Sequence, residues 1–166
     1  MNPRWLALPA LMVLAGCKDP AASYRNAAKQ LTFTLEQVEP NVQLAYPIEQ
    51  SRLDLKLTVK ADNPTNVRFK ARNIRGDISL DTEGTNHFLG QMGVDKGVDL
   101  APGTSTPVVV DLSFSYRDLR KASAILKSVV SGNRPGVWHL DGEMGLDVLG
   151  IPVTVPLKVK KPAGAP

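Results

Sequence analysis

The stretch "RLDLKLTVKA", residues 52–61, alternates strictly between polar and apolar side chains. Its apolar members share one parity: Leu53, Leu55, Leu57, Val59 and Ala61. Successive side chains of a β-strand point to opposite faces of a sheet. The stretch therefore predicts a β-strand with one face in a core and the other in water. A helix over residues 52–61 is excluded, because its apolar side chains would then be spread around the helix.

The same period of two recurs along most of the chain. Its apolar positions are Leu31, Phe33, Leu35; Gly76, Ile78, Leu80; Val108, Val110, Leu112, Phe114, Tyr116; Trp138, Leu140, Met144, Leu146; and Ile151, Val153, Val155, Leu157, Val159. Turn residues such as Asn63-Pro64, Glu83-Gly84 and Pro102-Gly103 separate these runs. Several short strands with one wet face predict an all-β antiparallel sandwich.

One segment between the strands has the period of a helix instead. In residues 117–132 a single stripe contains Leu119, Ala122, Leu126, Val129 and Val130. Gly132 follows it, at the position where glycine commonly ends a helix. We expect one short α-helix here, covering an open end or edge of the sandwich.

The first residues have the order of an export signal. Arg4 precedes an apolar run from Trp5 to Ala15, which is shorter than the roughly 20 residues that a membrane-spanning helix needs. The run ends in Leu14-Ala15-Gly16-Cys17, which resembles a bacterial lipobox. That resemblance implies removal of residues 1–16 and attachment of a diacylglycerol and an acyl chain such as palmitate to Cys17. Two or more such chains anchor a protein stably.

The lipobox resemblance also gives an expected location. Enterobacterial lipoproteins with aspartate directly after the cysteine favour the inner membrane, whereas here Lys18 holds that position and Asp19 follows. We expect a lipid-anchored protein in the outer membrane, facing the periplasm. Cys17 is the only cysteine, so no internal disulfide is available in that oxidising compartment.

Composition limits the partners and the number of domains. The chain has 166 residues and a formal net charge of +4, with charges interleaved rather than in blocks. This mild basicity, together with export, argues against nucleic acid as a partner. We expect a monomer with a polar, alanine-rich tether at 17–30, one sandwich domain at 31–160 and a short tail at 161–166.

An ordered series of motifs resembles the late-embryogenesis-abundant (LEA) type 2 family, which includes water-stress and hypersensitive-response domains. The series begins with the alternating strand and the turn Asn63-Pro64-Thr65-Asn66, continues through Leu89-Gly90 and "DLAPGTSTPVVVDLSFSY", and ends in "GEMGLDVLGIPVTVPLKVK". Thr65 stands where the family usually has its second asparagine, and Asn66 follows one place later. The resemblance implies an immunoglobulin- or fibronectin-III-like sandwich linked to stress tolerance, with some members proposed to handle lipids.

Two sets of residues are candidates for a structural or binding role. Asn63, Pro64 and Asn66 are interpreted as a structural turn, because asparagine amides bond to nearby backbone groups and proline restricts the residue before it. Arg68, Lys70 and Arg72 share one side of an extended segment, and Arg75 follows. These four cations are candidates for contact with an anionic lipid surface; the alternative is an edge strand protected by its charges.

Catalysis has weak candidates only. His139, Asp141 and Glu143 share a strand face by parity, but it is the face opposite Trp138, Leu140 and Met144 and therefore projects into water. His87 lies beside a turn, without an acidic or cysteine neighbour at ligand spacing. We expect no enzymatic activity, no cofactor and no metal site.

The sequence thus favours a non-enzymatic, membrane-anchored LEA type 2 lipoprotein, with a role in stress or desiccation protection or in binding at the cell envelope. The alternative is a module that binds or transfers a lipid or another apolar ligand. That ligand would lie between slightly parted sheets or beneath the helix of residues 117–132.

Overall fold

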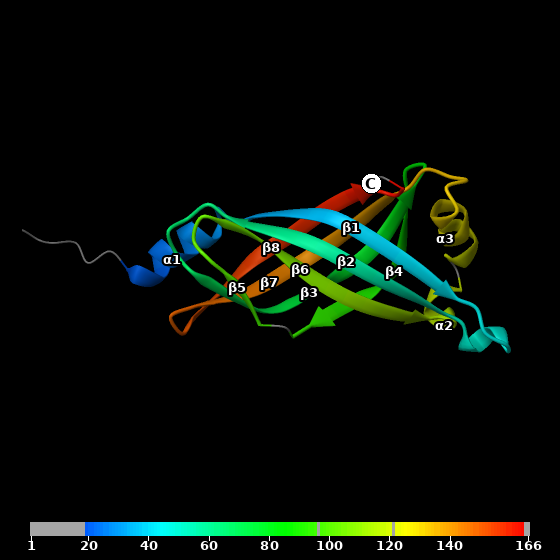
Figure 1. Ribbon diagram of the computed structural model, residues 1–166, viewed down its shortest axis with the longest axis horizontal. Coiled ribbons are helices and arrows are strands. Elements are labelled where there is room, and N and C mark those ends of the chain that lie inside the picture. The colour runs from blue at the N-terminus through cyan, green and yellow to red at the C-terminus, as the bar shows by residue number, and fades with distance from the viewer. Residues whose placement is uncertain (1–18, 96, 121, 165–166) are drawn as a thin grey trace, which may run out of the picture.

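The computed structural model describes residues 19–95, 97–120 and 122–164. Two sheets pack face to face in an elongated sandwich (Figure 1). One sheet has the order β1 (Thr32–Gln43), β2 (Arg52–Asn63), β6 (Thr104–Ser115). The other has the order β4 (Thr85–Val94), β3 (Phe69–Thr82), β7 (Val137–Val148), β8 (Ile151–Pro162), with β5 (Val98–Leu100) also paired to β3. The pairings between these strands are antiparallel, so the predicted all-β sandwich is confirmed.

The core lies between the two layers and consists of the side chains that the alternation predicts. In β2, Leu53, Leu55 and Leu57 are each at most 1% exposed, while their polar neighbours face outward. The inward positions of the facing sheet, on β3, β7 and β8, are buried too: Ile78, Leu80, Trp138, Leu140, Met144, Val153, Val155 and Leu157. Burial of such side chains contributes roughly 1.5–3 kcal/mol each, before the entropy of ordering the chain is subtracted.

Two glycines let β3 and β7 run close together in the middle of this sheet. Gly76 pairs directly with Gly142. A Cβ atom on Gly76 would lie 2.6 Å from the carbonyl oxygen of Asp141, so a larger residue could not fit without moving the backbone of β7.

The segment expected to be a tether contains a helix, α1 (Pro20–Ala28). Asp19 accepts a hydrogen bond from the backbone N–H of Ala21, and Pro20 occupies the first turn, where its missing N–H has no cost. Ala28 is buried, and Tyr24 and Ala27 pack against the core. The helix therefore extends from one end of the sandwich as a packed element (Figure 1). Within the described residues, no helix has the length and apolar character needed to span a membrane.

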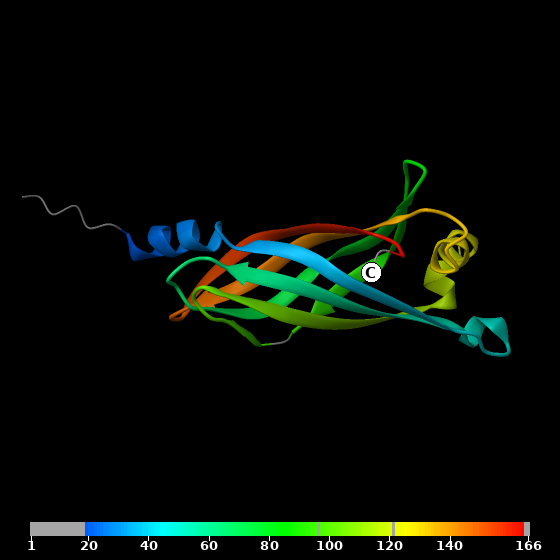
Figure 2. The same cartoon turned by 45° about the horizontal axis from the view of Figure 1, so that its top comes forward.

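The opposite end of the sandwich carries the other helical elements, as the rotated view shows (Figure 2). The 3₁₀ turn η1 (Ile48–Gln50) joins β1 to β2, and α2 (Tyr116–Leu119) and α3 (Ser123–Val130) join β6 to β7. The helix predicted for residues 117–132 is thus divided in two. Leu126 and Val129 of α3 are buried, as is Ala122 directly before it, and Gly132 follows the helix with a φ of +71°.

The Asn63 turn joins the two sheets. The Asn63 side chain is 1% exposed, and its amide nitrogen donates to the carbonyl oxygens of Val67 (2.8 Å), Leu100 (3.0 Å) and Ala101 (3.2 Å). Its Oδ1 atom accepts from the backbone N–H of Thr65 (3.1 Å) and from the Thr65 hydroxyl (2.7 Å). Asn63 ends β2 of one sheet and Leu100 ends β5 of the other, so this one amide links them. Pro64 and Asn66 are exposed, and Thr65 supplies the second polar partner of the turn.

We predict that Asn63→Asp lowers the free energy of unfolding by about 3 kcal/mol at neutral pH, because a buried carboxylate would face carbonyl oxygens that have lost their donor. The deficit should shrink at acid pH, where the protonated carboxyl regains one donor. Urea unfolding at both pH values measures this. Asn66→Asp, the same chemical change on an exposed neighbour, is the control and should stay within about 0.5 kcal/mol of the wild type. Equal effects of the two variants would contradict the role given to Asn63.

Candidate functional site

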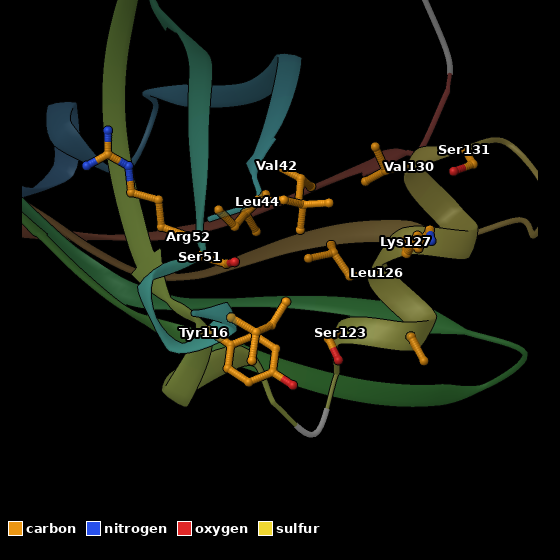
Figure 3. A pocket seen from close by; sticks show the side chains of 13 residues that line it. Val42, Leu44, Ser51, Arg52, Tyr116, Ser123, Leu126, Lys127, Val130 and Ser131 are labelled. Atoms are coloured by element: carbon orange, nitrogen blue, oxygen red, sulfur yellow. The ribbon is translucent and has the colours of Figure 1, made fainter. Parts of the chain in front are cut away.

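An apolar pocket of about 440 Å³ opens at the end of the sandwich that carries η1, α2 and α3 (Figure 3). Its walls come from the end of β1 and the segment after it, from η1, from the start of β2, from α2 and from α3. The lining residues are Val42, Leu44, Ile48, Ser51, Arg52, Leu53, Tyr116, Ser123, Ala124, Leu126, Lys127, Val130 and Ser131. A cavity of this volume is within the range of roughly 300–1,000 Å³ that is typical of small-molecule sites.

Exposed apolar side chains gather around this pocket. Among the described residues, seven large hydrophobic side chains are exposed, and five of them belong to the pocket or to the segment beside it: Val42, Leu44, Tyr46, Ile48 and Val130. Leu44 is 77% exposed and Tyr46 is 97% exposed. A concentration of exposed apolar surface around a concavity marks an interaction site.

Leu53 and Leu126 connect the pocket to the core. Both line the pocket, yet they are only 1% and 3% exposed. The pocket is therefore a continuation of the space between the sheets, at the point where the strands end and α3 covers them only partly.

Ser51 fixes the segment that forms one wall. Its side chain is buried, and its Oγ atom accepts a hydrogen bond of 3.0 Å from the backbone N–H of Ala45. Its carbonyl oxygen accepts one of 2.9 Å from the N–H of Tyr116, at the start of α2. One bond to the Ser51 side chain and one to its backbone therefore hold the segment between β1 and β2 against α2 and form this wall of the pocket.

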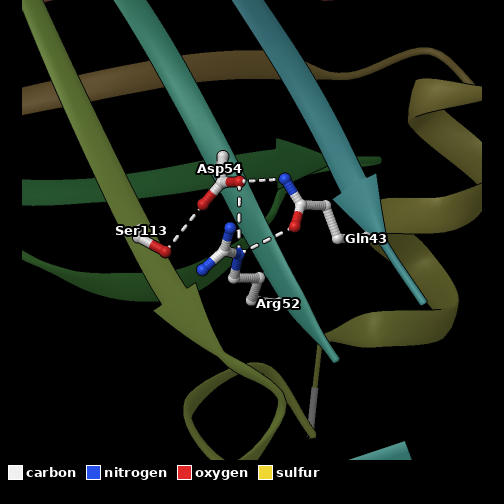
Figure 4. Close-up of polar contacts among 4 residues, drawn as sticks. All are labelled: Gln43, Arg52, Asp54 and Ser113. Carbon is white, nitrogen blue, oxygen red and sulfur yellow. Dashed lines mark hydrogen bonds and ion pairs between the residues drawn. The ribbon is translucent and has the colours of Figure 1, made fainter. Parts of the chain in front are cut away.

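A polar network on the outer face of the three-stranded sheet holds the strand ends next to the pocket (Figure 4). Asp54 accepts hydrogen bonds of 2.7 Å from Gln43 on β1 and from Ser113 on β6. Arg52 donates to Gln43 Oε1 at 2.9 Å, and its Nε atom lies 3.5 Å from Asp54. The Arg52 guanidinium is therefore directed to the outer face, and only its aliphatic stem is left to line the pocket (Figures 3 and 4).

The structure brings the four candidate cations onto one face, away from the pocket. Arg68, Lys70 and Arg72 are exposed beside buried Phe69 and Ala71. A bulge between Ala71 and Asn73 then shifts the parity of β3 by one residue, so Arg75 returns to the same outer face. These residues lie on or next to β3, which is paired on both sides; the interpretation as an edge strand is therefore wrong.

Carboxylates accompany these cations. Arg72 forms an ion pair of 2.6 Å with Asp147 of β7, whose side chain is only 15% exposed. Arg75 is in register with Glu143, and Lys70 is in register with Asp99 and Asp147. The face is thus of mixed charge, which weakens its attraction for an anionic surface.

The weak catalytic candidates lie apart from any assembled site. Asp141 and Glu143 are exposed on the outer face of β7, and His139 is half-buried there, in register with Ser79 and Lys160. None of these residues lines the pocket under α3. Among the described residues, no group of three histidine, cysteine, aspartate or glutamate side chains could share a metal ion. The lipobox of Leu14, Ala15, Gly16 and Cys17 lies outside the described residues.

Comparisons with known proteins give similar folds at low identity. No model of a protein family and no curated protein matches the sequence. An Arabidopsis thaliana protein solved in solution has a TM-score of 0.49 at 12% identity, over 81% of this chain and 81% of that one. A solution structure described as a late embryogenesis abundant protein has a TM-score of 0.43 at 15% identity, over 87% of this chain and 81% of that one. A protein from Archaeoglobus fulgidus has a TM-score of 0.46 at 11% identity, over 80% of this chain and 98% of that one.

These similarities concern the fold alone. What the pocket can do follows from its own residues.

Proposed function

We propose that this chain is a lipid-anchored, non-catalytic protein of the cell envelope whose end pocket binds an apolar ligand. One observation supports this most: the exposed apolar side chains gather around a single concavity, which opens beneath α3. This is one of the two places that the sequence analysis gives for a lipid or another apolar ligand.

Ligand entry has a clear driving force. An apolar ligand in the pocket would remove Leu44, Ile48 and Val130 from water, and full burial of such a side chain contributes roughly 1.5–3 kcal/mol. The buried side chains of Leu53 and Leu126 would form the floor beneath it. Nothing in this arrangement calls for a nucleophile or a general base.

Helix α1 and the pocket lie at opposite ends of the molecule. The chain enters the sandwich through α1, and the pocket opens at the end that carries α2 and α3 (Figure 1). With Cys17 acylated close to the start of α1, the pocket would face away from the anchoring membrane. In the outer membrane this places the binding site in the periplasm, available to ligands that arrive from the inner side.

We predict that Val130→Asp weakens binding of the neutral apolar dye Nile red at least about tenfold, or about 1.4 kcal/mol, because the dye would have to desolvate a carboxylate at the pocket wall. A fluorescence titration of the chain from Lys18 to Pro166, which contains every described element, measures this. Leu149→Asp is the matched control: Leu149 is 85% exposed in the turn between β7 and β8, far from the pocket. Failure of the unsubstituted chain to bind Nile red, or equal losses in both variants, would contradict the proposal.

Anchoring is tested separately by metabolic labelling with palmitate. The wild-type chain should incorporate the label and sediment with membranes, whereas Cys17→Ser should do neither, because the serine cannot take the thioether-linked lipid. Ser23→Ala, on the exposed side of α1, should behave as the wild type. Label in Cys17→Ser equal to the wild type would exclude Cys17 as the anchor.

The stress-protective role implied by the LEA resemblance is tested by drying. A client enzyme such as lactate dehydrogenase should keep more activity after drying with the chain from Lys18 to Pro166 than with an equal mass of an inert protein. If the pocket mediates protection by covering exposed apolar surface on the client, Val130→Asp should lose the benefit and Leu149→Asp should keep it. If the client enzyme keeps no more activity with this chain than with the inert protein, the stress-protective role is contradicted.

A further inference from the structure

We infer that the ligand of the end pocket is a long-chain fatty acid, whose carboxylate is held by Ser123, Lys127 and Ser131 of α3 and the residue after it. This rests on the proposed function and specifies its ligand. The chain of the fatty acid would lie against the apolar wall, and its head against these three polar side chains.

The three polar residues form a stripe because they are four apart. Residues at this spacing lie on the same face of a helix, one turn above another, so the Lys127 ammonium has a hydroxyl one turn to each side. All three residues line the pocket. Leu126 and Val130, one position earlier than Lys127 and Ser131, form a parallel apolar stripe on the same wall. Figure 3 shows Val130 and Ser131 at one end of α3 and Ser123 at the other, with Lys127 between them.

The described residues give the pocket a charge of one sign. Among them, Lys127 and Arg52 are the charged residues of its lining, and both are cations. Arg52 is already bonded to Gln43 and Asp54 on the outer face. Within the described residues, no carboxylate forms an ion pair with Lys127. An unpaired ammonium group beside an apolar cavity favours a ligand that brings a negative charge.

The position of this charge favours a fatty acid over a phospholipid. Lys127 and Leu126 line the same pocket, so a ligand whose anionic group follows directly on its apolar chain would contact both. A carboxylate meets this condition. In a lysophospholipid a polar glycerol unit separates the acyl chain from the phosphate, and that unit would lie against Leu126 and Val130. A lysine ammonium also offers three donors to the two carboxylate oxygens. The Ser123 hydroxyl donates to the carbonyl oxygen of Arg120 at 3.3 Å, and it would have to turn from that bond to donate to the ligand.

The test compares palmitate with methyl palmitate and hexadecanol, which have the same chain length without the charge, at concentrations below micelle formation. By competition against Nile red, palmitate should bind the chain from Lys18 to Pro166 at least about tenfold more tightly than either neutral compound. Lys127→Met keeps the aliphatic stem and the helix propensity but removes the charge. It should abolish the preference, so that palmitate and methyl palmitate compete equally for the pocket. Lys160→Met, on an exposed position of β8, is the control and should keep the full preference.

The competition experiment separates the fatty-acid assignment from the existence of the apolar pocket. Equal binding of palmitate and methyl palmitate, with Nile red still bound, would overturn the fatty-acid assignment and leave the apolar pocket standing. A preference that survives in Lys127→Met would show that α3 does not hold the head group. Tighter binding of lysophosphatidylglycerol than of palmitate would reassign the ligand to a lipid with a phosphate head. No binding of Nile red or palmitate would overturn both the assignment and the proposed function.

Discussion

Burial between two layers is the interaction on which the rest of this molecule depends. Each sheet can hide only one face, so every strand must place its apolar side chains on a single parity. The leucines of β2 meet this requirement at every second position, and buried side chains of β7 and β8 lie on the inner face of the opposite sheet. The buried amide of Asn63 adds a polar link between the two sheets to this apolar contact.

The same constraint creates the pocket. Strand pairing can close the sandwich along its length, but at the end of the strands the apolar layer must be covered by something else. The chain covers it partly with η1, α2 and α3, and leaves core side chains such as Leu53 and Leu126 as the floor of a concavity. The binding site is thus the incompletely covered end of the core. It is apolar because its floor consists of core side chains. On one wall its polar side chains come from α3 and the residue after it, where Ser123, Lys127 and Ser131 follow the helical period.

The sequence was sufficient for the elements that have a simple period. The alternation predicted β1, β2, β3, β6, β7 and β8, and the stripe at Leu126 and Val129 predicted a helix near the correct position. It did not predict β4 or β5, and it assigned Tyr116 to a strand although this residue begins α2. It could not predict the bulge between Ala71 and Asn73, because a bulge changes parity without a characteristic residue. It also could not give the order of the strands in the sheet, and so an edge position stayed open as the alternative for the segment that carries Arg68, Lys70 and Arg72. The helix in residues 20–28 was also missed: its alanine-rich composition resembles a linker, and the burial of Ala28 depends on contacts with the sandwich.

The position of the pocket also could not be predicted from the sequence, because it depends on contacts between distant segments of the chain. Its walls come from residues 42–53 and 116–131, which are distant in the chain and meet only after both sheets have formed. The spacing of Ser123, Lys127 and Ser131 was visible, but a polar stripe on a helix ordinarily faces water. Only the apolar cavity in front of it gives the stripe a role in binding.

The central claim is that the ligand site lies at the end of the sandwich and not between its sheets. Amide chemical-shift mapping of the chain during titration with a ligand tests it most directly. The account predicts that the shifts concentrate in residues 42–53 and 116–131. Shifts spread along the middle of β2, β7 and β8, with those two segments unaffected, would show a ligand between parted sheets and would contradict it.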